Sequence, residues 1–354
     1  MSNKIPIRFS LILVFVCGIL TGYTLNYTRE VQGTVLRTLE ETHDDEGFYT
    51  SPKKRQMFSR RWAQAIKEAD EMLSKENSDT IMPSCLIPNK HATMELVQQQ
   101  LLAHQQSSQS DQTTMTQPPP LVPLPIMNLG MPKTGSTTLF EFLTCAGLRG
   151  THQILGSHVL SGHKSPITFE GVCMRDAVNN GLPPIGTCAP NEQFMMQMDS
   201  EFPLGFGTRS FVANEHLDEC YFPQLELLEE FHREVPNATF IMNFRPIEHW
   251  IHSMRKWYGM FARFRVCNLP NKPTGIPQNI TDDAEFTIEF KRFLCSHVLH
   301  FRQFVQDHPS HKLIELDLYD TNTSSYVMST LFPNSQTMDP PCWQHANQNP
   351  QSTN

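Results

Sequence analysis

Short apolar runs alternate with helical patterns from residue 121 to about residue 345. The first run, Pro125 to Leu129, passes through a glycine-containing turn into a helical pattern over Thr137 to Ala146. Further strand-like runs occupy 194–198, 238–244 and 313–318, and further helical patterns occupy 225–235, 247–261 and 286–307. Strands that alternate with helices are typical of parallel sheets, because parallel neighbours need crossover connections. The pattern predicts an α/β fold with a central, mainly parallel sheet.

The composition agrees with a folded domain and argues against a nucleic-acid binder. The 354 residues include 28 Lys and Arg against 36 Asp and Glu, a formal charge of −8. Nucleic-acid-binding domains are usually basic. Hydrophobic residues make up 39% of the chain and charged residues 18%, which excludes wholesale disorder and permits a large core. The net acidity still leaves room for a local basic pocket that binds anions.

The N-terminal 25 residues have the pattern of a membrane signal anchor. Residues 9–25 (FSLILVFVCGILTGYTL) carry no charge and follow Lys4 and Arg8. The positive-inside rule then predicts a cytoplasmic tail over 1–8, a single-pass type II transmembrane helix over 9–25 and a luminal chain beyond it. A cleaved signal peptide is the alternative, and it directs the chain to the same compartment.

Cysteines and glycosylation sequons agree with a location in the secretory lumen. Eight cysteines follow Cys17, an even number that can pair in an oxidising compartment. Cys173 and Cys188 lie fifteen residues apart on either side of a turn-rich segment, and this predicts a disulfide that staples a loop. Asn-x-Ser/Thr sequons occur at Asn26, Asn237, Asn279 and Asn322.

Residues 26–120 have the composition of a stem. Met57 to Ser74 has helical periodicity and is either a short coiled coil or a helix docked on the main domain. Gln98 to Gln117 is rich in Gln, Ser and Thr and runs into three prolines, which is typical of a linker with a stiff end. We therefore expect a luminal stem over 26–120, the main domain over 121–345 and a C-terminal tail over 346–354.

The turn after the first strand has the residues of a phosphate-binding loop. Gly130 and Gly135 permit positive φ and close backbone approach, and Lys133 between them supplies a positive charge. The N–H groups and the dipole at the start of the next helix favour a bound anion. The residues assigned to this site are Lys133, Thr134, Gly135, Ser136, Thr137 and Thr138. The loop is not a Walker A motif, in which Lys directly follows the last glycine, and an ordinary capped turn is the alternative.

This loop resembles the 5′-phosphosulfate loop of sulfotransferases that use 3′-phosphoadenosine 5′-phosphosulfate (PAPS). The family's loop has the form Pro-Lys-x-Gly-Ser/Thr-Thr, which Pro132 to Thr137 match. In that family an Arg at the end of a later strand and a Ser eight positions on hold the 3′-phosphate, and Arg245 and Ser253 have this spacing. Thr138 stands where many cytosolic members carry an aromatic residue that stacks on adenine, and their C-terminal Arg-Lys-Gly loop is absent. The luminal carbohydrate and protein sulfotransferases are therefore the nearer relatives.

The resemblance implies a P-loop-type three-layer sandwich, preceded by the transmembrane helix and the stem. It implies a Golgi membrane enzyme that transfers a sulfuryl group from PAPS, without a metal, to a hydroxyl or amine of a glycan, glycolipid or protein, with a glycan or glycoprotein as the expected partner. Lys133 would then stabilise the leaving adenosine 3′,5′-bisphosphate. The acceptor's identity and the oligomeric state stay open. A P-loop nucleotide kinase or NTPase, and a luminal binding protein without catalytic activity, are the alternatives.

Sulfuryl transfer to a hydroxyl also needs a group that takes up the acceptor's proton. The carboxyl ends of parallel strands face the ligand crevice, and Asp199 follows the strand-like run 194–198. Asp199 is therefore our first choice for the catalytic base, and Glu201, His158 and His163 are the alternatives. The histidines and cysteines lack the spacing that closes a zinc site, so no metal is expected.

Overall fold

The computed structural model places five parallel strands in one sheet, in the order β2-β5-β1-β6-β7. It describes residues 52–75, 83–107, 118–155, 168–200, 221–257, 260, 283–338 and 342–343. The strands of the sheet are β1 (Ile126–Asn128), β2 (Gly150–Thr151), β5 (Phe194–Met195), β6 (Thr239–Phe244) and β7 (Lys312–Asp317). All four neighbouring pairs are parallel, which confirms the α/β fold with a parallel sheet. A separate antiparallel pair joins β3 (Ile154–Leu155) to β4 (Thr168–Phe169).

The sheet separates two hydrophobic clusters because successive side chains of a strand point to opposite faces. Ile126 packs in one cluster and Met127 in the other, and Ile241 and Phe240 on the next strand divide in the same way. Every residue of β6 is buried, as expected for a strand of a parallel sheet covered on both faces. Helices therefore cover both faces of the sheet.

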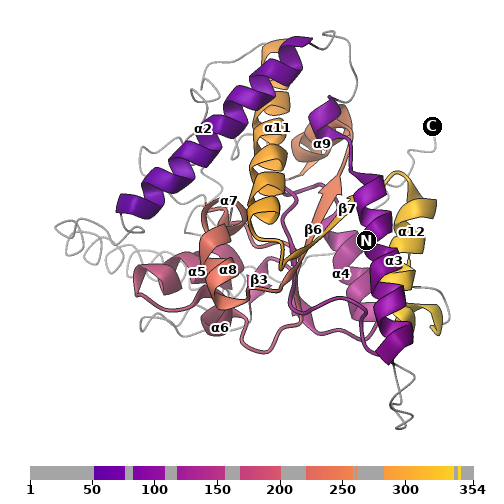
Figure 1. Ribbon diagram of the computed structural model, residues 1–354. Helices are drawn as coiled ribbons and strands as arrows, with labels where there is room; N and C mark the ends of the chain where they lie inside the picture. The colour runs from indigo at the N-terminus through magenta and orange to yellow at the C-terminus, as the bar shows by residue number, and fades with distance from the viewer. Residues whose placement is uncertain are drawn as a thin grey trace, which may run out of the picture. The chain divides into compact units, whose positions relative to one another are not determined.

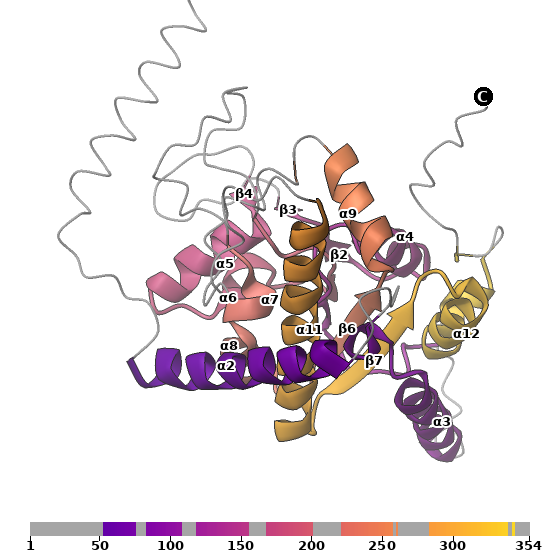
Figure 2. The same cartoon turned by 90° about the horizontal axis from the view of Figure 1, so that it is seen from above.

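Figure 2 shows β6 and β7 between α11 on one face and α3 and α12 on the other. The first face is covered by α2 (Pro52–Lys75), α5 (Glu170–Asn179), α6 (Pro184–Cys188), α7 (Pro223–Glu226), α8 (Leu228–Glu234), α9 (Ile247–Lys256) and α11 (Asp283–Asp307). The second face is covered by α3 (Lys90–Ser107), α4 (Ser136–Cys145) and α12 (Thr321–Leu331). Two short 3-10 helices, η1 (Ser84–Leu86) and η2 (Pro333–Gln336), complete the described elements.

Three expected elements differ in extent from those in the structure. The helix expected over 247–261 ends at Lys256, because Trp257 has an extended backbone. The strand expected over 194–198 pairs only through Phe194 and Met195. The helix expected over 225–235 is divided at Leu227, which lies between α7 and α8 with φ −112° and ψ 18°. Leu227 is also fully buried. Periodicity alone does not reveal such a break, because the apolar spacing continues through it.

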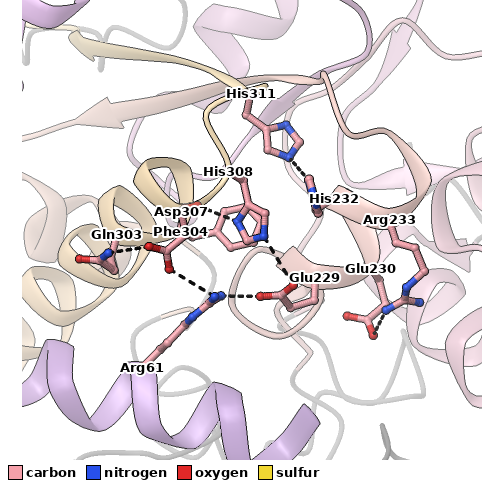
Figure 3. Close-up of polar contacts among 10 residues, drawn as sticks. All are labelled: Arg61, Glu229, Glu230, His232, Arg233, Gln303, Phe304, Asp307, His308 and His311. Carbon is pink, nitrogen blue, oxygen red and sulfur yellow. Dashed lines mark hydrogen bonds and ion pairs between the residues drawn. The ribbon is translucent and has the colours of Figure 1, made fainter.

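The helix expected near residues 57–74 is present and docks on the main domain. Figure 1 shows α2 lying across α11, and Trp62 and Ala69 of α2 are buried in the core. Arg61 forms ion pairs with Glu229 of α8 and, at 3.2 Å, with Asp307 at the end of α11 (Figure 3). The stem expected over 26–120 thus contains a helix whose apolar face is covered by the domain.

A second helix of that expected stem, α3, also packs on the domain. It contacts β7 and α12, and the Thr93 hydroxyl accepts a hydrogen bond from the Glu315 amide at 3.0 Å. The helix extends to Ser107, well into the Gln-rich segment that the composition assigns to a linker. The residues that α3 buries, Thr93, Leu96 and Val97, precede the Gln-rich segment, whose side chains are mostly exposed, so its composition says nothing about the docked turns.

Three disulfides tie distant parts of the described chain together. Cys173–Cys188 confirms the predicted loop staple between α5 and α6. Cys85–Cys295 joins η1 to α11, and Cys145–Cys342 joins α4 to the C-terminal segment. Such pairing is typical of secreted and luminal proteins. Within the described ranges no helix is both long and apolar enough to cross a bilayer, and the expected span 9–25 lies outside them.

Candidate functional site

Four candidate segments lie at the carboxyl ends of neighbouring strands. The glycine-containing loop follows β1, His152 follows β2, Asp199 lies shortly after β5, and Arg245 directly follows β6. The chain leaves β1 on one side to form β2 and β5 and then crosses to the other side to form β6. Open parallel sheets bind ligands at the carboxyl ends of the strands around such a reversal. The topology therefore places the predicted loop where a ligand crevice is expected.

The loop from Gly130 to Gly135 is a tight turn held by hydrogen bonds to its own backbone. The Gly130 amide donates to Oδ1 of Asn128 at 3.0 Å, and the Thr134 hydroxyl donates to the Met131 carbonyl at 2.6 Å. Lys133 and Gly135 both have positive φ, 67° and 118°. Gly135 is the N-cap of α4, so the first N–H groups of that helix are directed at the loop. The geometry provides a helix N-terminus suited to an anion.

Both glycines of the loop are required by close packing against β6 and the residues after β7. A Cβ atom on Gly130 would overlap Oδ1 of Asn243 and lie 2.7 Å from the Thr134 hydroxyl. A Cβ atom on Gly135 would overlap the side chain of Leu318. The two positions therefore exclude other residues for steric reasons, in addition to the positive φ at Gly135.

The second motif contacts the loop directly. Nη1 of Arg245 donates to the Lys133 carbonyl at 2.8 Å, and the Trp250 indole N–H donates to the Pro132 carbonyl at 2.7 Å. Nζ of Lys133 lies 3.6 Å from the ring centroid of Trp257, the residue that directly follows α9. The structure thus brings Lys133 and Arg245 together, although 112 residues separate them. Ser253 lies half-buried on the same helix as Trp250.

A chain of polar side chains leads from the loop helix to Asp199. Oγ of Ser136 lies 3.1 Å from Nε2 of His152 and 3.1 Å from Oε1 of Gln197. The amides of Gln197 and Gln224 each donate to Asp199 at 3.3 Å. Asp199 is buried, with 1% of its surface exposed, whereas His152 is partly exposed. Asp199 therefore contacts the loop through two intermediate side chains.

Sequence reasoning did not select His152 or Glu170, and both have strongly shifted pKa values. Burial and the positive charge of Lys133 lower the pKa of His152 to about 4, so its imidazole is neutral above that pH. Burial raises the pKa of Glu170 to about 8, against a hydrogen bond from the Thr151 hydroxyl. His152 follows a strand of two residues, too short to leave an apolar run in the sequence. Glu170 carries no sequence signal beyond its place at the start of a helix.

The site also contains buried polar atoms without protein partners. Among the described residues, neither amide atom of Asn243 has a hydrogen-bond partner, and the same holds for Nε of Arg245. Such atoms are rare in folded proteins because each costs about 1–3 kcal/mol. The unpartnered donor Nε of Arg245 and the N-terminus of α4 suit an anion such as a phosphosulfate group, whereas the Asn243 amide packs against Gly130 and needs a separate explanation.

Other expected residues are not placed. Glu201, His158 and His163 lie outside the described residues. Across the described ranges, no group of three or more His, Cys, Asp and Glu side chains is arranged to hold a metal ion. No protein-family model, curated protein or solved structure matches the chain. The assignment of a function therefore depends on the site itself.

Proposed function

We propose that the chain is a PAPS-dependent sulfotransferase. The observation that carries this proposal is the hydrogen bond from Arg245 to the Lys133 carbonyl, which joins the two phosphate motifs at the carboxyl ends of the strands. One guanidinium nitrogen is used in this contact, and a guanidinium has further N–H donors for an anion. Two anion sites side by side suit a nucleotide with phosphate groups at both its 3′ and 5′ positions.

In this proposal the loop holds the 5′-phosphosulfate, and Arg245 and Ser253 hold the 3′-phosphate. The acceptor oxygen attacks sulfur, the bond from sulfur to the phosphate oxygen breaks, and adenosine 3′,5′-bisphosphate leaves. Lys133, together with the N–H groups of Gly135 to Thr138, stabilises the negative charge that develops on the leaving phosphate. The ring of Trp257 holds the Lys133 ammonium group beside the loop by a cation–π contact.

In this proposal the acceptor's proton is taken up by a base that also lies at the carboxyl ends of the strands. Geometry favours His152, because its partly exposed imidazole lies against Ser136 of the loop helix and is neutral above about pH 4. A pKa this low makes the imidazole a weak base, and an anion bound beside Lys133 would raise the pKa by offsetting the lysine's charge. Asp199 accepts hydrogen bonds from two side-chain amides. Through one of them, Gln197, it orients the row of polar side chains that leads to the loop helix. A direct role of Asp199 as the base is the alternative that the sequence favours.

The proposal extends to the compartment and the acceptor. The three disulfides support an oxidising lumen, and with the expected anchor over 9–25 they support a type II membrane enzyme of the Golgi. The acceptor class is a hydroxyl or amine on a glycan, glycolipid or protein, since these are the nucleophiles that the lumen offers to such an enzyme.

The test is transfer of labelled sulfate from PAPS by the full chain to a panel of glycans and tyrosine peptides. We expect incorporation for at least one acceptor and its loss in Lys133→Ala, with the thermal unfolding temperature unchanged. Lys67→Ala, an exposed lysine on α2, is the matched control and should keep full activity. Binding of Mg-ATP with no sulfate transfer would favour a nucleotide kinase, and donor binding without transfer to any acceptor would favour a binding protein.

A further inference from the structure

Asn243 is the fifth residue of β6, a strand whose other positions are mostly apolar. Its side chain is 3% exposed, and both amide atoms lack hydrogen-bond partners among the described residues. An apolar residue would fill this position in the sheet without that loss. An unpartnered buried amide on an interior strand therefore needs an explanation other than stability.

A second buried asparagine, on the neighbouring strand β1, provides the comparison. Oδ1 of Asn128 accepts from the Gly130 amide at 3.0 Å, and its Nδ2 donates to the Met196 carbonyl at 2.6 Å. Asn128 thus supports the start of the loop with both amide atoms in use. Asn243 lies beside the same loop from the other strand with neither atom in use.

The amide of Asn243 lies on the inner side of the loop. Its Cγ is 2.8 Å from the position of a Cβ atom on Gly130, and its Nδ2 is 3.7 Å from the corresponding position on Gly135. The amide therefore spans the distance between the two glycines that bound the turn. Arg245, two residues further along the chain, bonds the Lys133 carbonyl between them.

Anion binding by a backbone turn requires a particular orientation of its peptide groups. When several N–H groups point outward at an anion, the carbonyl groups of the same peptides point the opposite way, into the protein. In this loop the Met131, Pro132 and Lys133 carbonyls already accept hydrogen bonds. Among the hydrogen bonds of the described residues, this leaves the Gly130 and Thr134 carbonyls for a further donor, because an unpaired buried carbonyl is costly. Nδ2 of Asn243 has two donor hydrogens at that place, and Oδ1 can accept from an N–H that does not face the anion.

We propose that Asn243 is a positioning residue that hydrogen-bonds the inner side of the loop when a phosphosulfate or phosphate group occupies its outer side. The nature of this anion rests on the proposed sulfotransferase function. The amide stays unpartnered without the anion and gains partners on binding. Asn243 thereby raises donor affinity at the expense of the stability of the free protein.

This role predicts opposite effects on stability and binding. Asn243→Leu removes an unpartnered amide from a buried site, so the unfolding temperature of the free full-length chain should stay the same or rise. Its affinity for adenosine 3′,5′-bisphosphate, measured by titration calorimetry, should fall about tenfold or more, the loss expected for one or two buried hydrogen bonds. Asn243→Asp keeps the shape but removes the donors, and should weaken binding at least as much.

Asn128→Leu is the matched control, because it removes an asparagine whose amide is already bonded. It should lower the unfolding temperature of the free protein, which Asn243→Leu should not. Loss of stability in Asn243→Leu equal to that in Asn128→Leu would assign Asn243 a purely structural role and overturn the proposal. Unchanged bisphosphate affinity in Asn243→Leu would overturn it as well.

Inorganic pyrophosphate separates this proposal from the proposed function. If the wild-type chain binds pyrophosphate but shows no affinity for adenosine 3′,5′-bisphosphate, the sulfotransferase assignment fails, while the pyrophosphate titrations of the same variants still test Asn243. If the wild-type chain binds both and Asn243→Leu binds both equally well, the sulfotransferase assignment survives and the role of Asn243 is refuted.

Discussion

Polar side chains gather at both ends of the parallel strands, which we call the amino edge and the carboxyl edge of the sheet. The two groups differ in whether their polar atoms have hydrogen-bond partners. At the amino edge, His232, His308 and His311 form a histidine junction where α8, α11 and β7 meet (Figure 3). The nitrogens Nδ1 of His232 and Nε2 of His311 lie 3.0 Å apart, and Nδ1 of His311 donates to the Ala238 carbonyl at 3.1 Å. Nδ1 of His308 donates to the Phe304 carbonyl at 2.9 Å.

At the carboxyl edge, some buried polar atoms of the described residues have no hydrogen-bond partner. Asn243 and Nε of Arg245 are buried without partners among the described residues, and Lys133 has a positive φ. Polar groups that serve only stability find partners within the protein, as those of the histidine junction do. Nε of Arg292 on α11 also lacks a partner in the described part of the chain, but the unpartnered atoms at the carboxyl ends of the strands lie beside a glycine loop and a helix N-terminus, which is why we place the function there.

The largest expected effect concerns the proton acceptor at the carboxyl edge. His152→Ala should lower kcat by about 10²–10⁴-fold with little change in bisphosphate affinity, the range for loss of a general base. Asp199→Asn should lower kcat less, since it disturbs only the orientation of the polar side chains that connect Asp199 to Ser136. Single-turnover sulfate transfer measures both, and the reverse order of the two losses would make Asp199 the base.

The next effect concerns recognition of the 3′-phosphate. The double variant Arg245→Ala/Ser253→Ala should lose about 100-fold in the preference for PAPS over adenosine 5′-phosphosulfate, because two hydrogen bonds to a charged group are removed. Competition between the two donors in the transfer assay gives the ratio directly. Full discrimination in the double variant would show that the second motif does not contact the 3′-phosphate.

The histidine junction should make folding stability depend on pH. Burial lowers the pKa of His311 to about 4. Burial and the neighbouring His308 also lower the pKa of His232, against the Glu229 carboxylate, which raises it. The unfolded chain binds protons at these imidazoles near pH 6.5, whereas the folded chain does not, so stability falls as the pH drops from about 6.5 towards 4. Each imidazole contributes at most about 1.4 kcal/mol per pH unit.

Denaturant unfolding of the full chain between pH 7.5 and 5 measures this slope. His311→Asn cannot titrate and keeps a donor for the Ala238 carbonyl, so its stability should change less with pH than that of the wild type. An equal slope in the two proteins would show that the junction does not titrate on unfolding.

The smallest effect concerns the docking of α2. Arg61→Gln should destabilise the fold by about 1 kcal/mol or less, because its ion pairs with Glu229 and Asp307 are partly exposed. The exposed neighbour Arg60 is the control, and Arg60→Gln should have no measurable effect on the unfolding temperature. A loss of several kcal/mol in Arg61→Gln would mean that the ion pairs rather than the buried Trp62 hold the helix.

The sequence predicted those parts of the structure that depend on neighbouring residues. The strand, glycine turn and helix around Lys133 are local, and so is the Cys173–Cys188 disulfide across fifteen residues. The match between Arg245 and Ser253 came from a spacing of eight residues. The contact of this motif with Lys133 is non-local, and only the order of the strands brings the two together.

The remaining features depend on long-range packing and leave little trace in the sequence. His152 gains its importance from Ser136 and Lys133 across two strands, and β2 before it has only two residues. Cys85–Cys295 spans 210 residues, and no spacing rule pairs such cysteines. Asn243 lies in a mostly apolar strand, and only the three-dimensional contacts show that its amide faces the loop.

The most direct test of the central claim is a crystal structure of the full chain with adenosine 3′,5′-bisphosphate. We predict that the 5′-phosphate lies against the backbone amides between Lys133 and Thr138, and that the 3′-phosphate contacts Arg245 and Ser253. Binding of the nucleotide at another place, or at this edge with neither phosphate on its assigned motif, would contradict the account.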